Sequence, residues 1–171
     1  MNYLEEVDKG MQLLANSESI IIGQAVNYKG HCLTRQAAFW PDTHRVEMPV
    51  AEDFQTGFAL GMAIDGHRVV SIYPRMNFVV CAMNQILNHL DKWEAMRGGQ
   101  LNIVLKGVVG SAYPLNPGHQ HQANWAEQVK GMCSSIKVHE LLYPHQVMPV
   151  YEEANIGGVH LVVEHGDLYA G

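Results

Sequence analysis

The chain has 171 residues, which is enough for one domain with a buried core. Its net charge of -6 argues against a nucleic-acid-binding protein, because such a protein needs a basic surface. No apolar run approaches the about 20 residues of a membrane-spanning helix, so we expect no membrane contact. Only 16% of the residues are charged, which indicates that partner subunits cover part of the surface.

Two features predict a cytoplasmic protein. The first ten residues, "MNYLEEVDKG", are acidic and lack the apolar segment of a signal peptide. The three cysteines, Cys32, Cys81 and Cys133, are widely spaced and form no CxxC motif. We therefore interpret them as reduced thiols and not as a disulfide framework.

Helical and strand patterns alternate along the chain. Apolar residues recur with helical spacing from Leu4 to Leu14, which predicts a helix over residues 3–15. Residues 24–45 lack clear periodicity and are interpreted as a loop that can include a short helix. Further helices are expected at 50–65, 77–96, 122–131 and 144–154. Strands are expected at 19–23, 68–73, 101–107, 135–140 and 158–166.

This alternation predicts one α/β domain over residues 1–171, a three-layer α/β/α architecture with a mainly parallel sheet. In such sheets ligands bind at the carboxyl ends of the strands. Three segments qualify: the loop before Glu52, the turn "YPRMN" and the loop "GVVGSAYPLNPGHQHQ". No GxGxxG motif and no P-loop occurs, so the sequence offers no phosphate-binding loop.

The acidic pair Glu52 and Asp53 follows Pro49 at the start of a helix that otherwise avoids charge. Proline and acidic residues both favour a helix N-terminus, where the helix dipole stabilises negative charge. This explanation suits both carboxylates equally, so the pattern leaves a functional role open. Gly57 and Gly61, four residues apart, allow another helix or a ligand to approach the backbone closely.

Two histidines, His119 and His121, lie in the Gly/Pro-rich loop. On an extended segment they would share a face, which could suit a metal ion, although the spacing shows no third ligand. A histidine at the end of a strand could instead act as a general acid or base, or donate to an oxyanion. The residues alone leave both possibilities open.

Several segments, in order, resemble the pyrimidine-binding domain of thiamine-diphosphate enzymes of the transketolase-like group. "IIIGQAV" is similar to a strand ending in Gly-Glu-Asp-Val, and "MPVAEDFQTGFALGMAIDGHRVV" to Pro-x-(Ser/Ala)-Glu-x-x-x-x-Gly-x-Ala-x-Gly-x-Ala. "NFVVCAMNQILN" is similar to Asn-Phe-x-x-x-Ala-x-Asp-Gln-x-x-Asn, and "GHQHQ" to a Gln-His-Ser-Gln loop. "CSSIKV" and "HLVVEHGDLYAG" complete the series. The resemblance is closest to the N-terminal half of the β subunit of 2-oxo acid dehydrogenase E1 components.

The resemblance implies roles for five residues. Glu52 matches the glutamate that hydrogen-bonds N1′ of the cofactor's aminopyrimidine, which favours the imino tautomer whose 4′-nitrogen can deprotonate thiazolium C2. Phe78 matches the aromatic residue that packs on the pyrimidine, and Val50 an apolar residue near the same ring. His121 best matches the loop histidine that faces the substrate or acyl intermediate. His119 is the second choice, because this loop differs in length.

The sequence departs from the family pattern at several points. Gln24 stands where the family usually has an acid that joins a proton path between paired active sites, and Asp53 replaces an apolar residue. The Gly-Asp-Gly…Asn motif for diphosphate and magnesium is absent. The C-terminal domain of E1 β subunits is expected to be absent as well, which argues against membership of a classical multienzyme complex.

The resemblance therefore implies a β-type subunit that is active only with a partner resembling the E1 α subunit. We expect an α2β2 heterotetramer, with self-association through the pyrimidine domain. Thiamine diphosphate would bind at the interface, with Mg2+ held mainly by the partner. The implied reaction is decarboxylation of a 2-oxo acid, with acyl or two-carbon-unit transfer by a carboligase as an extension. Two alternatives are a catalytically degenerate scaffold or regulatory subunit, and a metal-dependent hydrolase that uses His119 and His121.

Overall fold

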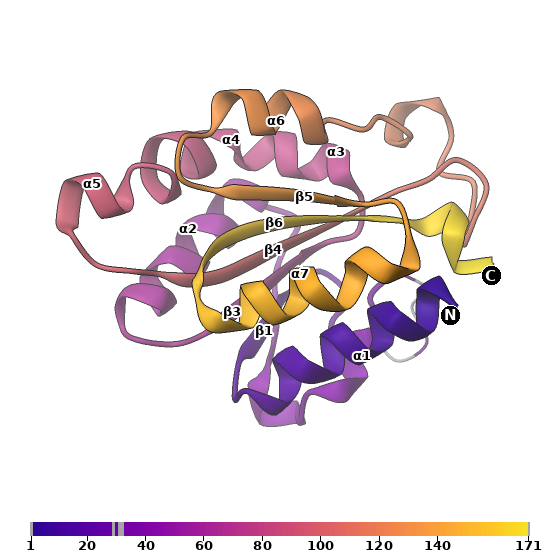
Figure 1. The fold of residues 1–171 in the computed structure, drawn as a ribbon, viewed down its shortest axis with the longest axis horizontal. Helices are drawn as coiled ribbons and strands as arrows, with labels where there is room; N and C mark the ends of the chain where they lie inside the picture. Colours follow the sequence, from indigo (N-terminus) through magenta and orange to yellow (C-terminus); the bar gives the residue numbers. More distant parts are fainter. Residues whose placement is uncertain (1, 29, 31–32, 171) are drawn as a thin grey trace.

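A six-stranded parallel sheet forms the centre of the molecule, in the order β2-β1-β3-β4-β6-β5 (Figure 1). The computed structural model describes residues 2–28, 30 and 33–170. Every neighbouring pair of strands is parallel. The prediction of a three-layer α/β/α domain with a mainly parallel sheet is therefore confirmed. The strands are β1 (Ile20–Gly23), β2 (Arg45–Glu47), β3 (Val69–Tyr73), β4 (Asn102–Val109), β5 (Lys137–Leu141) and β6 (Gly158–His165).

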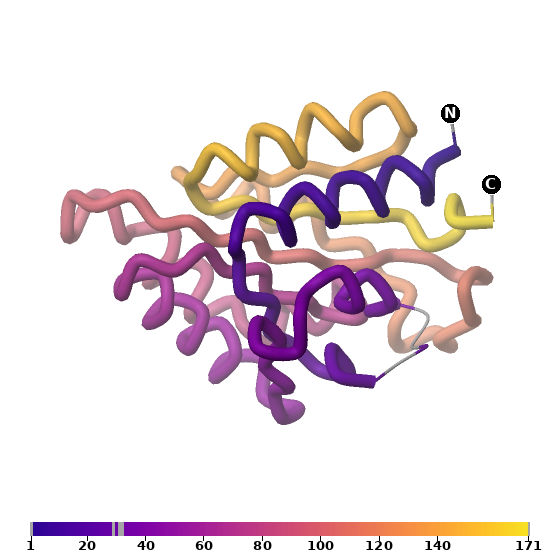
Figure 2. Tube along the Cα trace, turned by 90° about the horizontal axis from the view of Figure 1, so that it is seen from below, coloured from indigo at the N-terminus to yellow at the C-terminus, as the bar shows by residue number. Residues whose placement is uncertain are grey.

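Helices cover both faces of the sheet. The helices α1 (Tyr3–Asn16) and α7 (Pro144–Ile156) pack side by side on one face, as Figures 1 and 2 both show. The other face carries α2 (Glu52–Ile64), α3 (Met76–Val79), α4 (Met83–Gln85), α5 (Trp93–Arg97) and α6 (Ala126–Met132). Each face has its own apolar core, because β3, β4 and β6 bury side chains on both sides.

The sequence accounts directly for the first helix. The Asn2 side chain caps α1 by accepting hydrogen bonds from the backbone N–H groups of Leu4 and Glu5. Val7, Met11 and Leu14 then form the buried stripe that faces the sheet and α7. The helix predicted at 3–15 is thus found within one residue of its expected end.

Two parts of the chain differ from the sequence-based expectations. The segment 24–45, interpreted as a loop, contains the expected short helix as two 3₁₀ turns and also leads into β2, a strand that was not predicted. β2 is the outermost strand of the sheet, and its three residues are too few to show an alternating pattern.

The single long helix predicted at 77–96 is wrong in detail. The segment is divided into α3, a 3₁₀ turn (Val80–Ala82), α4, a π-helical turn (Ile86–Leu90) and α5. Val79, Ala82, Ile86 and Leu90 are nevertheless all buried on one side. The apolar spacing therefore stays helical while the backbone hydrogen bonding changes, and only the spacing is visible in the sequence.

Two further expectations concern the cysteines and membrane contact. Cys81 and Cys133 are free thiols, whereas Cys32 lies outside the described residues. Among the helices in the described part of the chain, none has the length and apolar character needed to cross a membrane.

A buried ion pair ties β4 to β6. Nζ of Lys106 lies 2.8 Å from Oε2 of Glu164, and both side chains are fully buried. The contact is an ion pair without hydrogen-bond geometry, while the hydroxyls of Tyr151 and Tyr169 donate hydrogen bonds to the same carboxylate. Burial, followed by the nearby Glu164 charge, raises the pKa of both tyrosines well above its usual value, so their hydroxyls are protonated donors at neutral pH.

Removing one charge of this pair should destabilise the fold strongly. We expect Lys106→Met to lower the free energy of unfolding by about 3–5 kcal/mol, because the Glu164 carboxylate stays buried without its counter-ion. Adding Glu164→Gln should recover most of that loss. The control Lys137→Met breaks an exposed pair with Glu153 and should change stability by about 1 kcal/mol or less. Urea unfolding at pH 7 measures the stability of all three variants. Equal losses of unfolding free energy for Lys106→Met and Lys137→Met would contradict a special role of the buried pair.

Candidate functional site

The strand order places the predicted site residues at one edge of the sheet, the edge formed by the carboxyl ends of the strands. The chain leaves β1 in one direction to form β2 and returns past it to form β3, so the order reverses between β1 and β3. Ligands bind parallel sheets at such a reversal, outside the carboxyl ends of the strands. Gln24 follows β1, Glu52 follows β2, Phe78 follows β3 and His121 follows β4. Four neighbouring strands thus each deliver one candidate side chain to the same edge.

Glu52 is the first residue of α2, and only 8% of it is exposed. Nε2 of Gln24 donates a hydrogen bond to Oε1 of Glu52 over 3.0 Å. Among the described residues, no group donates to the other carboxyl oxygen, Oε2. Asp53 differs from Glu52 in burial and in partner: it is exposed and accepts a hydrogen bond from Gln85 at the surface. The two acids that the helix-start pattern could not separate therefore occupy different environments.

Polar side chains behind Glu52 fix the first turn of α2 to the sheet. The Thr56 hydroxyl donates to the carbonyl of Glu52 and lies 2.5 Å from the Tyr73 hydroxyl. Nε2 of Gln55 donates to the Ser71 hydroxyl over 2.8 Å. All of these partners are buried. Burial raises the pKa of Tyr73 to about 12, so its hydroxyl stays protonated and available for hydrogen bonding.

His121 and Phe78 meet at this edge. Their ring centroids lie 5.1 Å apart at an angle of 56°, and Nδ2 of Asn77 lies 2.8 Å from Nδ1 of His121. Both rings are half-buried, whereas Val50 is 80% exposed. His119 is exposed and makes no hydrogen bond with another described residue. The structure thus brings His121, and not His119, against Phe78.

The extended geometry considered for a metal site is not found. Residues His119–His121 form a 3₁₀ turn, in which side chains two positions apart differ in direction by about 240°. In the described ranges of the chain, no group of three or more histidine, cysteine or acidic side chains is placed to hold a metal ion. The paired histidines therefore have no shared face at which to bind a metal.

Two side chains, Arg75 and Asp167, hold the loop that leads to His121. The guanidinium of Arg75 donates to the carbonyls of Gly110 and Leu115. The Asp167 carboxylate accepts hydrogen bonds from the backbone N–H groups of Ser111, Ala112 and Tyr113. Burial alone would raise the pKa of Asp167, but these backbone donors outweigh it and lower the pKa to about 2.

The Asp167 cap predicts a specific acid dependence of stability. A pKa lowered by folding adds stability above about pH 4, and this contribution is lost as the pH falls towards 2. Asp167→Asn should therefore cost about 1 kcal/mol at pH 7, the scale of other side-chain caps, and the difference from wild type should shrink below pH 4. Urea unfolding at pH 7, 4 and 2.5 tests this. A difference that stays constant across the three pH values would show that the carboxylate is not the cap.

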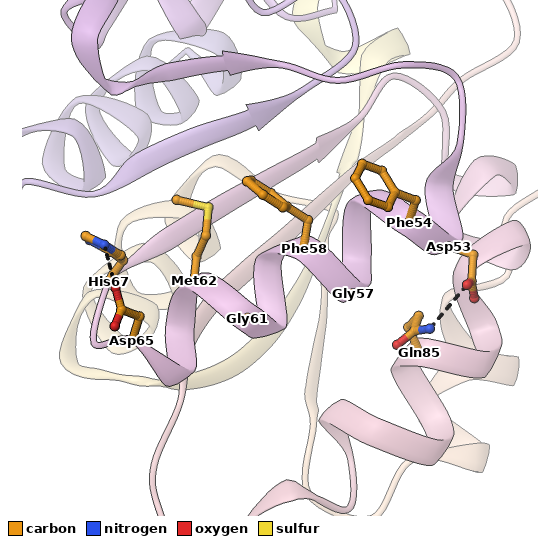
Figure 3. A pocket seen from close by; sticks show the side chains of 9 residues that line it. All are labelled: Asp53, Phe54, Gly57, Phe58, Gly61, Met62, Asp65, His67 and Gln85. Atoms are coloured by element: carbon orange, nitrogen blue, oxygen red, sulfur yellow. Dashed lines mark hydrogen bonds and ion pairs between the residues drawn. The ribbon is translucent and has the colours of Figure 1, made fainter.

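The outer face of α2 borders a groove of about 660 Å³ (Figure 3). Phe54 and Phe58 lie on the same side of the helix, 56% and 39% exposed, with ring centroids 6.1 Å apart. A Cβ atom at Gly61 would meet nothing within 4 Å, so no other part of the described chain fills the space that this glycine leaves. The remaining lining residues are Asp53, Gly57, Met62, Asp65, His67 and Gln85.

Comparisons with known proteins agree with this architecture. No family model matches the chain. The pyruvate dehydrogenase E1 component subunit beta of Pisum sativum is 30% identical over 141 residues, covering 79% of this chain and 37% of that protein. The Rhizobium meliloti subunit is 29% identical over 127 residues, covering 71% and 28% respectively. The chain is a relative of the E1 β subunits. It spans about a third of the length of these curated relatives.

A solved structure supports the fold of this E1 β relative. The structure described as "Split gene transketolase, inactive beta4 tetramer" covers 97% of this chain and 51% of its own, with a TM-score of 0.68 and 14% sequence identity. At this identity the likeness concerns the fold alone. Together the two comparisons confirm the resemblance to the transketolase-like pyrimidine domain.

Sequence reasoning missed three features of this E1 β relative. Asn77 and Asp167 were not singled out, because each acts on a residue far away in the sequence. The exposed phenylalanines of α2 carried a signal: Phe54 and Phe58 are four residues apart on one side of the helix, while Gln55 and Ala59 are buried. That spacing indicates an apolar outer face on a helix whose other face is buried.

Proposed function

We propose that this chain is the β-type subunit of a split thiamine-diphosphate-dependent enzyme that acts on a 2-oxo acid. The reaction is decarboxylation, with acyl or two-carbon-unit transfer to an acceptor as the possible continuation. The observation that carries the proposal is the Glu52 carboxyl group: it is nearly buried, held by Gln24 through one oxygen, and has its second oxygen available. It lies at the sheet edge where ligands of parallel sheets bind.

The residues at this edge fit an aminopyrimidine ring. Such a ring offers a nitrogen that needs a carboxyl partner and two flat apolar faces. Oε2 of Glu52 supplies the partner, the half-buried ring of Phe78 supplies an aromatic surface, and the exposed Val50 supplies an apolar contact. When bound, thiamine diphosphate acts as an electron sink for the carbanion left by decarboxylation.

The chain's own side chains have separate tasks in this proposal. Glu52 shares a proton at Oε2 with the ring nitrogen, and Gln24 keeps the carboxyl group oriented by occupying Oε1. Phe78 excludes water from one face of the site. His121, which packs against Phe78, is the side chain that we assign to the substrate. His119 is assigned no catalytic task, because it is exposed and apart from these groups.

A partner subunit completes the site in this proposal. The described residues form no metal-binding cluster, and the sequence has no diphosphate motif, so a chain resembling the E1 α subunit would hold Mg2+ and the diphosphate. The outer face of α2 is the docking surface that we assign to it. This face exposes Phe54, Phe58 and Ile64 and begins next to Glu52, so a chain bound there would border the cofactor. The assembly proposed is α2β2.

Replacing Glu52 tests its role directly. In the complex with the partner, Glu52→Gln should slow exchange of the cofactor's C2 proton at least about 100-fold, because an amide cannot share the proton with the ring nitrogen. The matched control is Asp53→Asn, which removes the neighbouring exposed carboxylate and should leave exchange unchanged. Proton NMR of the cofactor in deuterated buffer measures the rate. Equal rates for wild type and Glu52→Gln would return Glu52 to a helix-start role. A wild-type complex without any exchange would support the scaffold alternative.

The docking surface is tested by charge insertion. Phe58→Lys should weaken assembly with the partner about 30-fold, equivalent to about 2 kcal/mol for a central apolar contact. Leu142→Lys is the matched control, because Leu142 is similarly exposed but lies between β5 and α7. Analytical ultracentrifugation of the mixed subunits over a concentration series measures both. Wild-type assembly of Phe58→Lys would exclude the outer face of α2 as the interface.

A further inference from the structure

We propose that Asn77 is a positioning residue that fixes the tautomer of His121, with the ring proton on Nε2. His121 would then act at the substrate as a hydrogen-bond donor and not as a base. The chemical consequence rests on the proposed function, whereas the tautomer itself does not.

The contact between the two side chains determines the tautomer. Nδ2 of Asn77 lies 2.8 Å from Nδ1 of His121. A carboxamide NH2 group can only donate, so Nδ1 must be the bare acceptor nitrogen. In a neutral imidazole the proton is then on Nε2.

The orientation of the Asn77 amide is favoured by what surrounds it. Its Oδ1 is buried and accepts no hydrogen bond from the described residues. Turning the amide over would place Oδ1 at His121 but would bury the NH2 group at the unpartnered position. A buried donor without a partner is rarer in proteins than a buried carbonyl oxygen without one. The observed orientation therefore has the lower cost.

Asn77 and Phe78 hold the imidazole from two sides. The Phe78 ring packs against it at a tilt of 56°, with ring centroids 5.1 Å apart, and Asn77 occupies its Nδ1 edge. Both residues belong to α3, which follows β3 directly, so they are fixed to the sheet. The edge that carries Nε2 has no hydrogen-bond partner among the described residues. The proton-bearing nitrogen is therefore the one available to a ligand.

The same hydrogen bond also anchors the histidine turn. Within residues 116–122, Asn116 accepts from the backbone of Gly118 and from Gln122, and His121 donates its backbone N–H to Gly118. These contacts close the turn on itself. In the described part of the chain, the bond to Asn77 is the side-chain hydrogen bond that links this turn to α3. Loss of the Asn77 amide should thus free both the ring and the turn.

An Nε2–H group suits a reaction in which negative charge develops on the substrate. It can donate to the oxygen of a 2-oxo acid as that oxygen becomes an alkoxide, and it cannot remove a proton while Nδ1 is occupied by Asn77. Removing such a donor costs about 10²–10³ in kcat in enzymes in which the effect has been measured.

The tautomer is tested by nitrogen-15 NMR of the histidine rings in the full chain, at a pH at which the rings are neutral. Two-bond proton–nitrogen spectra separate bare from protonated ring nitrogens, and the missing signals of His121→Gln assign the ring. Wild type should show His121 with Nε2 protonated. Asn77→Asp replaces the donor by an acceptor and should move the proton to Nδ1. Asn84→Asp places the same charge on an exposed position of α4 and should leave the pattern of wild type. A wild-type ring with Nδ1 protonated, or an unchanged pattern in Asn77→Asp, would overturn the assignment.

Turnover in the complex separates the tautomer from the proposed function. Asn77→Asp should lower kcat about 10²–10³-fold and leave KM and cofactor affinity near their wild-type values, while Asn84→Asp should retain full turnover. Unchanged kcat in Asn77→Asp, together with a reversed tautomer, would overturn the donor role of His121. If wild type shows the Nε2 tautomer but turns over no 2-oxo acid, the proposed function is contradicted. The role of Asn77 as a positioning residue for the His121 ring would still hold in that case.

Discussion

Parallel pairing of the six strands is the constraint on which the rest of this molecule depends. Parallel neighbours need a crossover connection, so helices must cover both faces and the strands must be apolar on both sides. β4 shows the result, since Ile103–Val109 are all buried. All strands then point the same way, and the segments that follow them meet at one edge. For this reason Gln24, Glu52, Phe78 and His121 all follow strands at this edge, although up to 97 positions separate them in the sequence.

The helix α2 is unusual because it buries several polar side chains and exposes two aromatic ones. Its buried side includes Glu52, Gln55 and Thr56, while Phe54 and Phe58 face outwards. The buried polar groups are held by hydrogen bonds to Gln24, Ser71 and Tyr73. A surface helix normally has the reverse arrangement. This arrangement fits a helix that presents a carboxyl group to a ligand and an apolar surface to another protein, and it agrees with the low charged fraction of the chain.

The sequence was sufficient for the architecture because periodicity reports which face of an element is buried. It predicted the helix at 3–15 and the buried strands, but it missed β2, which is too short to carry a pattern. It could not show the 3₁₀ and π turns between Val80 and Leu90, since the apolar spacing there remains helical. Periodicity also could not distinguish Glu52 from Asp53. The resemblance did so, and the structure then showed their different burial.

The parts of the site that stayed hidden depend on tertiary contacts. Asn77 and His121 are 44 positions apart, and Asp167 caps backbone groups more than 50 positions earlier. No local pattern reports such pairs. Choosing between His119 and His121 likewise required the turn geometry, because the loop length left the alignment ambiguous. The structure favours His121 by placing its ring against Phe78.

The central claim is that Glu52 and Phe78 form the pyrimidine-binding surface of a two-chain enzyme. A crystal structure of the chain with its partner and thiamine diphosphate tests it most directly. The account predicts the pyrimidine N1′ within hydrogen-bonding distance of the Glu52 carboxyl group, and the ring packed on Phe78. A pyrimidine bound at another place, or a Glu52 side chain that contacts only Gln24 in that complex, would contradict it.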